Sequence, residues 1–123
     1  MRQRRNIITG LLALVGCGPT LTETSVEVDI TKLRTLMGAI KQKIPQGFTE
    51  QHIAEIEKDF RALQVNTTKQ YSFPITHDGN TTELNVSIRK EDVDAVEIHF
   101  YAPLRLTAVI EETIRNTPLD VTP

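Results

Sequence analysis

Three apolar–polar alternations in the second half of the chain constrain its fold more than any other feature. Apolar side chains occupy every second position in 71–75, 84–88 and 96–100. A period of two places successive side chains on opposite faces of a β-strand, so each segment is predicted to be a strand with one buried face. Asp78-Gly79 predicts a tight hairpin turn, and Lys90–Asp92 predicts the next turn. The three strands are therefore expected to form an antiparallel meander.

Three other segments repeat their apolar side chains with the helical period of 3.6. The first runs from Thr31 to Ile44, the second begins near Thr49, and the third opens at Pro103. Asp29 or Thr31 is expected to cap the first helix and Thr49 the second, because their side-chain oxygens can accept hydrogen bonds from first-turn amides. The short connection between the first two predicts a helical hairpin.

These elements predict an α+β fold, a two-layer sandwich with helices on one face of a three-stranded antiparallel meander, in the order α-α-β-β-β-α. A sheet that is apolar on one face only needs a cover on that face alone. Pro74 lacks an amide donor, so its strand is expected at the sheet edge. Residues 26–30 also alternate and fit either a short strand or a lead into the first helix.

The polar positions of the alternation are predicted to share the uncovered face of this sheet. The residues expected there are Asn85, Ser87, Arg89, Glu97, His99 and Tyr101. Arginine and aromatic side chains are enriched at contact sites, which favours a partner-binding surface. The alternative is that this face is the ordinary solvated side of a half-buried sheet.

Patterns that indicate catalysis or metal binding are weak in this sequence. His52, His77 and His99 have no metal-ligand spacing, and there is no glycine-rich phosphate loop or nucleophile elbow. The pair His77-Asp78 is explained by hairpin-turn chemistry. The sequence thus predicts a protein that is not an enzyme, with no catalytic residues, no metal and no cofactor.

The N-terminus has the pattern of an export signal. Arg2, Arg4 and Arg5 precede an apolar run that is shorter than the roughly 20 residues needed to cross a bilayer as a helix. The run closes on Leu14-Val15-Gly16-Cys17, which resembles the lipobox of bacterial lipoproteins. The resemblance covers residues 1–17 and implies cleavage before Cys17, diacylglycerol on its thiol and acylation of the freed amine.

The resemblance implies a division of the chain into a signal peptide (1–16), a lipidated Cys17 with its linker (17–28) and one domain (29–123). Gly18 follows the cysteine, which by the same resemblance permits transfer to the outer membrane where the source has one. The alternative interpretation is a core element whose Cys17 is an ordinary buried thiol. Cys17 is the only cysteine, so no internal disulfide can form.

The charge balance restricts the kind of partner. The chain has 14 basic and 16 acidic residues, and loss of the three N-terminal arginines would leave 11 against 16, a formal charge of −5. This balance argues against nucleic acid and does not support broad adhesion to anionic lipid. The predicted function is a lipid-anchored, periplasm-facing envelope protein that binds a protein partner. The alternatives are an immunity-type inhibitor of a toxin and a small-ligand-binding lipoprotein.

Overall fold

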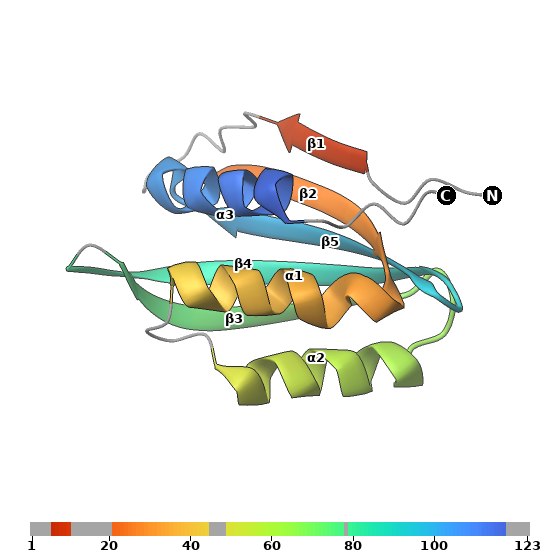
Figure 1. The fold of residues 1–123 in the computed structure, drawn as a ribbon. Coiled ribbons are helices and arrows are strands. Elements are labelled where there is room, and N and C mark those ends of the chain that lie inside the picture. The colour runs from red at the N-terminus through yellow and green to blue at the C-terminus, as the bar shows by residue number, and fades with distance from the viewer. Residues whose placement is uncertain (1–5, 11–20, 45–48, 78, 118–123) are drawn as a thin grey trace.

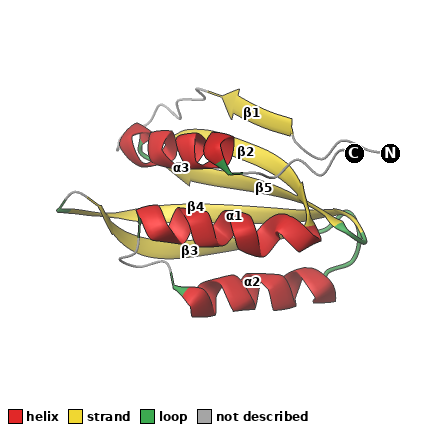
Figure 2. Ribbon diagram, viewed as in Figure 1, coloured by secondary structure: helices red, strands yellow, loops and turns green. Residues whose placement is uncertain are grey.

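An antiparallel sheet of five strands, covered by helices, organises the chain (Figures 1 and 2). The computed structural model describes residues 6–10, 21–44, 49–77 and 79–117, without the side chains of 6–10 and His77. The spatial order of the strands is β1-β2-β5-β4-β3. Their bounds are Asn6–Gly10 for β1, Thr22–Asp29 for β2, Thr68–His77 for β3, Asn80–Asp92 for β4 and Ala95–Ala102 for β5.

The predicted three-stranded meander with the order α-α-β-β-β-α is wrong, because two strands precede the helices. Strands β3, β4 and β5 do pair in succession, but β2 pairs antiparallel with β5 from Thr22 opposite Ala102 to Asp29 opposite Ala95. Strand β1 then pairs with the other edge of β2. Residues 22–28, expected in the linker, thus form most of β2. Threonine is β-branched and suits a strand, although a small polar run also resembles a linker.

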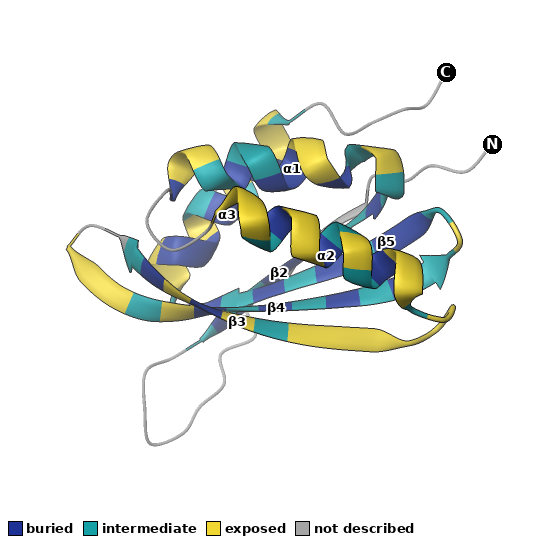
Figure 3. Cartoon of the chain, turned by 90° about the horizontal axis from the view of Figure 1, so that it is seen from below, coloured by how far each residue is buried: buried dark blue, intermediate teal, exposed yellow. Residues whose placement is uncertain are grey.

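Three helices lie on one face of the sheet: α1 (Ile30–Lys43), α2 (Glu50–Ala62) and α3 (Leu104–Asn116) (Figure 3). The predicted caps of the first two are confirmed. Asp29 accepts a hydrogen bond of 3.0 Å from the Thr31 amide. The Thr49 hydroxyl accepts one of 3.3 Å from the His52 amide, and His52 Nδ1 accepts one of 3.2 Å from the Thr49 amide.

The core lies between the sheet and the helices. Of the nine side chains expected to face inward, Tyr71 is half-buried and the others are buried: Phe73, Ile75, Leu84, Val86, Ile88, Val96, Ile98 and Phe100. They pack with apolar residues of β2 and of the three helices in one cluster. Within the described residues, the other face of the sheet carries no helix, and we call it the open face (Figure 3).

A buried lysine joins β4 to the end of α2. Lys90 is only 9% exposed, and its Nζ donates hydrogen bonds to the carbonyls of Phe60 at 3.2 Å and Leu63 at 2.9 Å. The same ammonium lies 4.8 Å from the centroid of the Phe60 ring. Carbonyls at the end of a helix carry partial negative charge, so the lysine complements α2. The expected turn at Lys90–Asp92 is wrong, because β4 continues to Asp92.

A second link joins α2 to the edge strand β3. The Tyr71 hydroxyl donates to Asp59 Oδ2 at 2.7 Å, and Lys69 Nζ lies 3.0 Å from the same oxygen. The hydrogen bond from Tyr71, followed by that from Lys69, lowers the pKa of Asp59. Burial, reinforced by the Asp59 carboxylate, raises the pKa of Tyr71. At neutral pH Asp59 is therefore ionised and Tyr71 is protonated, which are the states that favour their mutual hydrogen bond.

Candidate functional site

The open face carries polar side chains in three rows that cross four strands, and Ser25 is the one buried member. The strand register places the six predicted site residues together on this face, and β2 and β3 add further members. From β3 through β4 and β5 to β2, the rows are Ser72–Asn85–Tyr101–Glu23, Gln70–Ser87–His99–Ser25 and Thr68–Arg89–Glu97–Glu27. Residues opposite one another in an antiparallel pair are close enough for side-chain contact.

A chain of close polar contacts runs across these rows. His99 Nδ1 pairs with Glu23, and His99 Nε2 lies 3.3 Å from Glu97 Oε1. Arg89 lies 3.7 Å from the same Glu97 oxygen and pairs with Glu91 on its own strand. The order Glu23–His99–Glu97–Arg89–Glu91 therefore joins β2, β5 and β4. These side chains are only partly exposed, so their positions are more restricted than those of free surface charges.

Tyr101 lies beside Glu23 and His99, at one end of this chain of contacts. Its ring stacks beside that of His99 with centroids 6.3 Å apart and an interplanar angle of 14°. Burial raises the pKa of Tyr101, and the negative charge and hydrogen bond of Glu23 raise it further. The phenol is therefore neutral at physiological pH. It presents an aromatic ring beside an acidic group on the open face.

A pocket of about 400 Å³ lies next to Tyr101 on the open face. Its lining residues are Leu21, Gln70, Tyr71, Ser72, Asn85, Val86, Ser87 and Tyr101. The side chains of Gln70, Ser72, Asn85 and Ser87 form no hydrogen bond in the part of the chain that the structure describes. These uncharged groups supply donors and acceptors that an incoming ligand could use.

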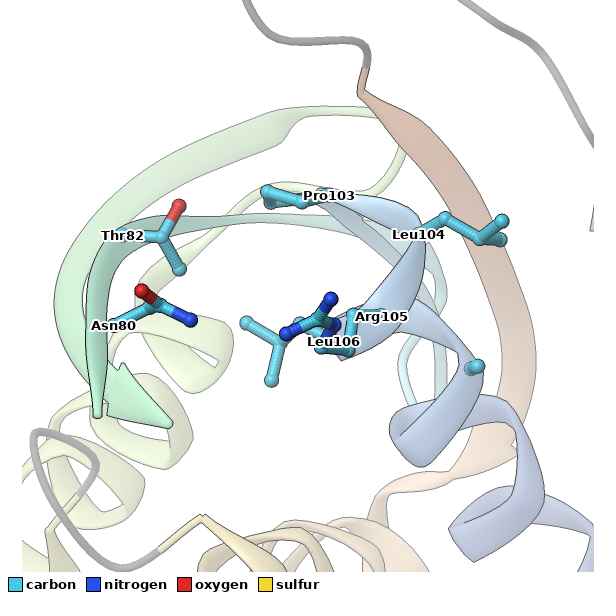
Figure 4. Close-up of a pocket in the computed structure, with 7 residues that line it drawn as sticks. Asn80, Thr82, Pro103, Leu104, Arg105 and Leu106 are labelled. Atoms are coloured by element: carbon cyan, nitrogen blue, oxygen red, sulfur yellow. The ribbon is translucent and has the colours of Figure 1, made fainter. Parts of the chain in front are cut away.

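A second, larger hollow of about 670 Å³ lies where α3 begins (Figure 4). Its wall combines the start of β4 with the first turns of α3. The lining residues are Asn80, Thr82, Pro103, Leu104, Arg105, Leu106 and Ala108. The helical part of this lining is mainly apolar, and Leu104 is 56% exposed. The single charged member, Arg105, is exposed.

The three histidines have different surroundings. His52 belongs to the α2 capping box and its ring lies 4.5 Å from that of Phe73, whereas His99 is on the open face. His77 ends β3, and its side chain lies outside the described part, as does Cys17. Among the described residues, no group of three or more His, Cys, Asp or Glu side chains is arranged to hold a metal ion.

The sequence alone did not identify Glu23, Ser25 and Glu27 as members of the open face. Their signal was present, because they alternate with Thr24, Val26 and Val28. No helix in the described ranges combines the length and apolar character needed to cross a membrane. Comparisons of the chain with models of protein families, with curated proteins and with solved structures found no match.

Proposed function

We propose that this protein is a lipid-anchored component of a bacterial cell envelope that binds a partner protein through the open face. The Leu-Val-Gly-Cys sequence supports the anchor, which would be carried by Cys17. The chain of polar contacts from Glu23 to Glu91 supports the binding face and carries the proposal. Side chains that are already held in place lose less conformational entropy when a partner binds.

The composition of the face suggests the charge of the partner. Glu23, Glu91 and Glu97 supply three carboxylates, against the guanidinium of Arg89 and the His99 ring. A partner with a basic patch would complement this surface and be steered toward it. A basic toxin would meet that requirement, which is how the immunity-type alternative would operate.

Processing at Cys17 is compatible with the rest of the fold. Cleavage would remove residues 1–16 and with them β1, which pairs only along the outer edge of β2. The core cluster of described residues begins at Val26, after the cleavage point. The mature protein would keep a four-stranded sheet with the order β2-β5-β4-β3 and the complete open face.

Single alanine substitutions test the binding face. Arg89, Glu97, His99 and Tyr101 would each be replaced by Ala, followed by cross-linking in cells and recovery of the bound protein. We expect weaker recovery with unchanged folding for each variant. Arg115→Ala is the control, because Arg115 is exposed on α3 in the helical layer and pairs with Glu111 at 2.8 Å. Equal recovery for all five variants would refute the binding face.

Metabolic labelling with a clickable palmitate analogue tests the anchor separately. We expect label on the wild type, in the membrane fraction, and none on Cys17→Ser. An unlabelled wild type that retains its N-terminus would exclude lipidation, whatever the result of the cross-linking experiment.

The open-face pocket favours a second candidate function, binding of a small uncharged ligand. Gln70, Ser72, Asn85 and Ser87, which form no side-chain hydrogen bond among the described residues, and the Tyr101 ring suit a ligand rich in hydroxyl groups, such as a saccharide. A titration with neutral oligosaccharides, followed by ¹H–¹⁵N NMR, tests this function. We expect shifts confined to the pocket in the wild type and their loss in Asn85→Ala. Unchanged spectra of the wild type would exclude these ligands.

A further inference from the structure

In the full chain, β1 lies along the outer edge of β2 (Figure 1). The two strands pair antiparallel from Asn6 opposite Glu27 to Gly10 opposite Glu23. All of β1 precedes Cys17, so the proposed cleavage would remove it and leave the backbone groups on this edge of β2 without partners. The four-stranded sheet of the mature protein would then end in β2 on one side and β3 on the other.

The edge at β3 has two features that oppose the addition of a further strand. Pro74 lacks an amide hydrogen, and Lys69 places an exposed charge on the strand. Proline and lysine are among the residues by which sheet edges avoid pairing with other chains. We therefore do not expect a partner to extend the sheet at β3.

The edge at β2 lacks both features. Its sequence, Thr-Glu-Thr-Ser-Val-Glu-Val-Asp, contains no proline, lysine or arginine, and all eight residues pair with β5 in unbroken register. Val26 and Val28 belong to the core cluster, and α3 contacts both β2 and β1. A strand in the place of β1 would therefore meet a regular backbone edge beside the core and beside α3. Such an edge is a template for strand pairing.

The alternation of β2 determines which side chains the added strand should carry. Opposite residues of an antiparallel pair share a face, and Glu23 and Glu27 are partly exposed members of the open face. Lysine or arginine opposite these two carboxylates would complement them. On the helix face, an apolar residue would suit Val26. A threonine would suit Thr24, whose hydroxyl has no hydrogen-bond partner among the described residues.

A second copy of the chain fits this edge less well than a basic strand does. Two β2 strands can pair antiparallel over most of their length with their core faces on the same side. In those registers Glu23 lies opposite either Glu27 or Asp29 of the second copy. Like charges directly opposite one another destabilise a strand pair. The charges of β2 thus favour a basic partner over self-association.

From this edge and its charges we propose that the mature protein binds an extended segment of its partner as an additional strand along β2. The segment runs antiparallel to β2, with basic residues on the side of the open face and apolar residues on the side of the core. The proposal deepens the proposed function and rests on it, because β1 leaves only if residues 1–16 are cleaved. In this mode of recognition, backbone hydrogen bonds give affinity and alternate side chains give specificity.

A synthetic peptide tests the edge directly. The peptide Val-Lys-Ile-Ile-Thr-Lys-Leu, with blocked ends, keeps Ile7, Ile8 and Thr9 of β1 and places its lysines opposite Glu27 and Glu23. The mature ¹⁵N-labelled protein would be purified from membranes in detergent, and amide hydrogen exchange would be followed by NMR with and without excess peptide. We expect at least about tenfold slower exchange of the outward-facing amides of β2 and unchanged exchange in β3.

Control peptides separate the contributions of the backbone and of charge. Alternate amides of the peptide would be N-methylated in either of the two possible patterns. Only the pattern that blocks the amides facing β2 should abolish the protection, because the other amides point away from the sheet. Glutamate in place of both lysines should weaken the protection.

Protein variants test the same charges from the other side. Glu27→Lys, and the milder Glu27→Gln, should weaken protection by the lysine peptide. Glu83→Lys is the matched control, because it makes the same change of charge at an exposed position of β4, away from β2, and should leave protection unchanged.

Three results would overturn the inference. They are unprotected β2 amides in a protein whose spectrum shows an intact sheet, equal protection by both N-methylated peptides, and a dimer whose β2 edge is already protected without peptide. If mass spectrometry shows that the cells retain residues 1–16, the chain would be cut in vitro at a protease site inserted before Cys17 and titrated in the same way. Failure of processing and failure of strand addition are then read independently.

Discussion

Replacement of Lys90 by methionine should destabilise the protein, because it removes a buried ammonium group that binds carbonyls at the end of α2. Methionine retains most of the apolar stem but has no ammonium group. The lysine donates bonds of 3.2 and 2.9 Å to the carbonyls of Phe60 and Leu63. The Phe60 carbonyl also accepts from the Leu63 amide, so the larger loss is at the Leu63 carbonyl. A net hydrogen bond to a charged group contributes about 1.5–3 kcal/mol.

That gain is partly offset, because the ammonium loses hydration in its buried position. We therefore expect Lys90→Met to lower the free energy of unfolding by about 1–3 kcal/mol. Urea denaturation followed by far-ultraviolet circular dichroism would measure the change. With a denaturant slope of about 1–3 kcal/mol per molar, the midpoint should fall by roughly 1 M.

Lys69→Met is the matched control for this experiment. Lys69 is also a lysine of the sheet, but its side chain is 47% exposed and pairs with Asp59 at 3.0 Å. An exposed pair of this kind contributes at most about 1 kcal/mol. If Lys90→Met cost no more than Lys69→Met, the buried lysine would not stabilise the end of α2.

Two other substitutions give predictions of opposite sign. Thr24 is 1% exposed, and its Oγ1 has no hydrogen-bond partner in the described structure, so Thr24→Val should stabilise the protein by about 1 kcal/mol in the same urea experiment. A lower midpoint would reveal a bond to the hydroxyl. Asp59→Asn should be destabilising at neutral pH, because the hydrogen bond from Tyr71 and then Lys69 hold the carboxyl pKa below its ordinary value of 3.8. This stabilisation is present above the unfolded-state pKa and is lost as the pH falls through the lower folded-state value, so the difference from wild type should shrink below about pH 4. A pH-independent difference would contradict the role of the ionised carboxylate.

Local sequence was sufficient for the helix caps and for the β3–β4 hairpin, in which the interacting residues are near in the chain. The cap of α2 needs only Thr49 and a residue three positions later, and the hairpin of β3 and β4 turns next to Gly79, whose φ is +76°. β2 was different, because its partner β5 lies far along the chain. This pairing places Ser25 opposite His99. The Thr-Glu-Thr-Ser sequence at residues 22–25 has the composition of a linker, and it forms a strand because it pairs with β5. Pairing with a distant strand therefore determined the secondary structure of β2, which residue propensities alone did not determine.

The candidate site was also predictable in part: local alternation identified some of its residues, and others were missed. A period of two was enough to place Arg89, His99 and Tyr101 on one face, because alternation fixes the face once the strands are known. Glu23, the carboxylate that pairs with His99, was missed because residues 22–25 were assigned to a linker, although Glu23 follows the same alternation. The inward position of Lys90 was missed for a related reason. The strand continues past Ile88, and a lysine can be buried there only because the end of α2 supplies carbonyls.

If the protein is anchored as proposed, Pro74 in β3 would have a consequence for crowding at the membrane. A tethered protein is confined to two dimensions, where copies meet edge to edge more often than they would in solution. β3 is one of the two edge strands of the sheet, and its backbone groups could pair with a strand of a neighbouring copy. Pro74 lies opposite Glu83 in the middle of this edge and offers no amide hydrogen to a second strand. An approaching copy would leave a carbonyl without a donor, so this edge resists self-association at high surface density.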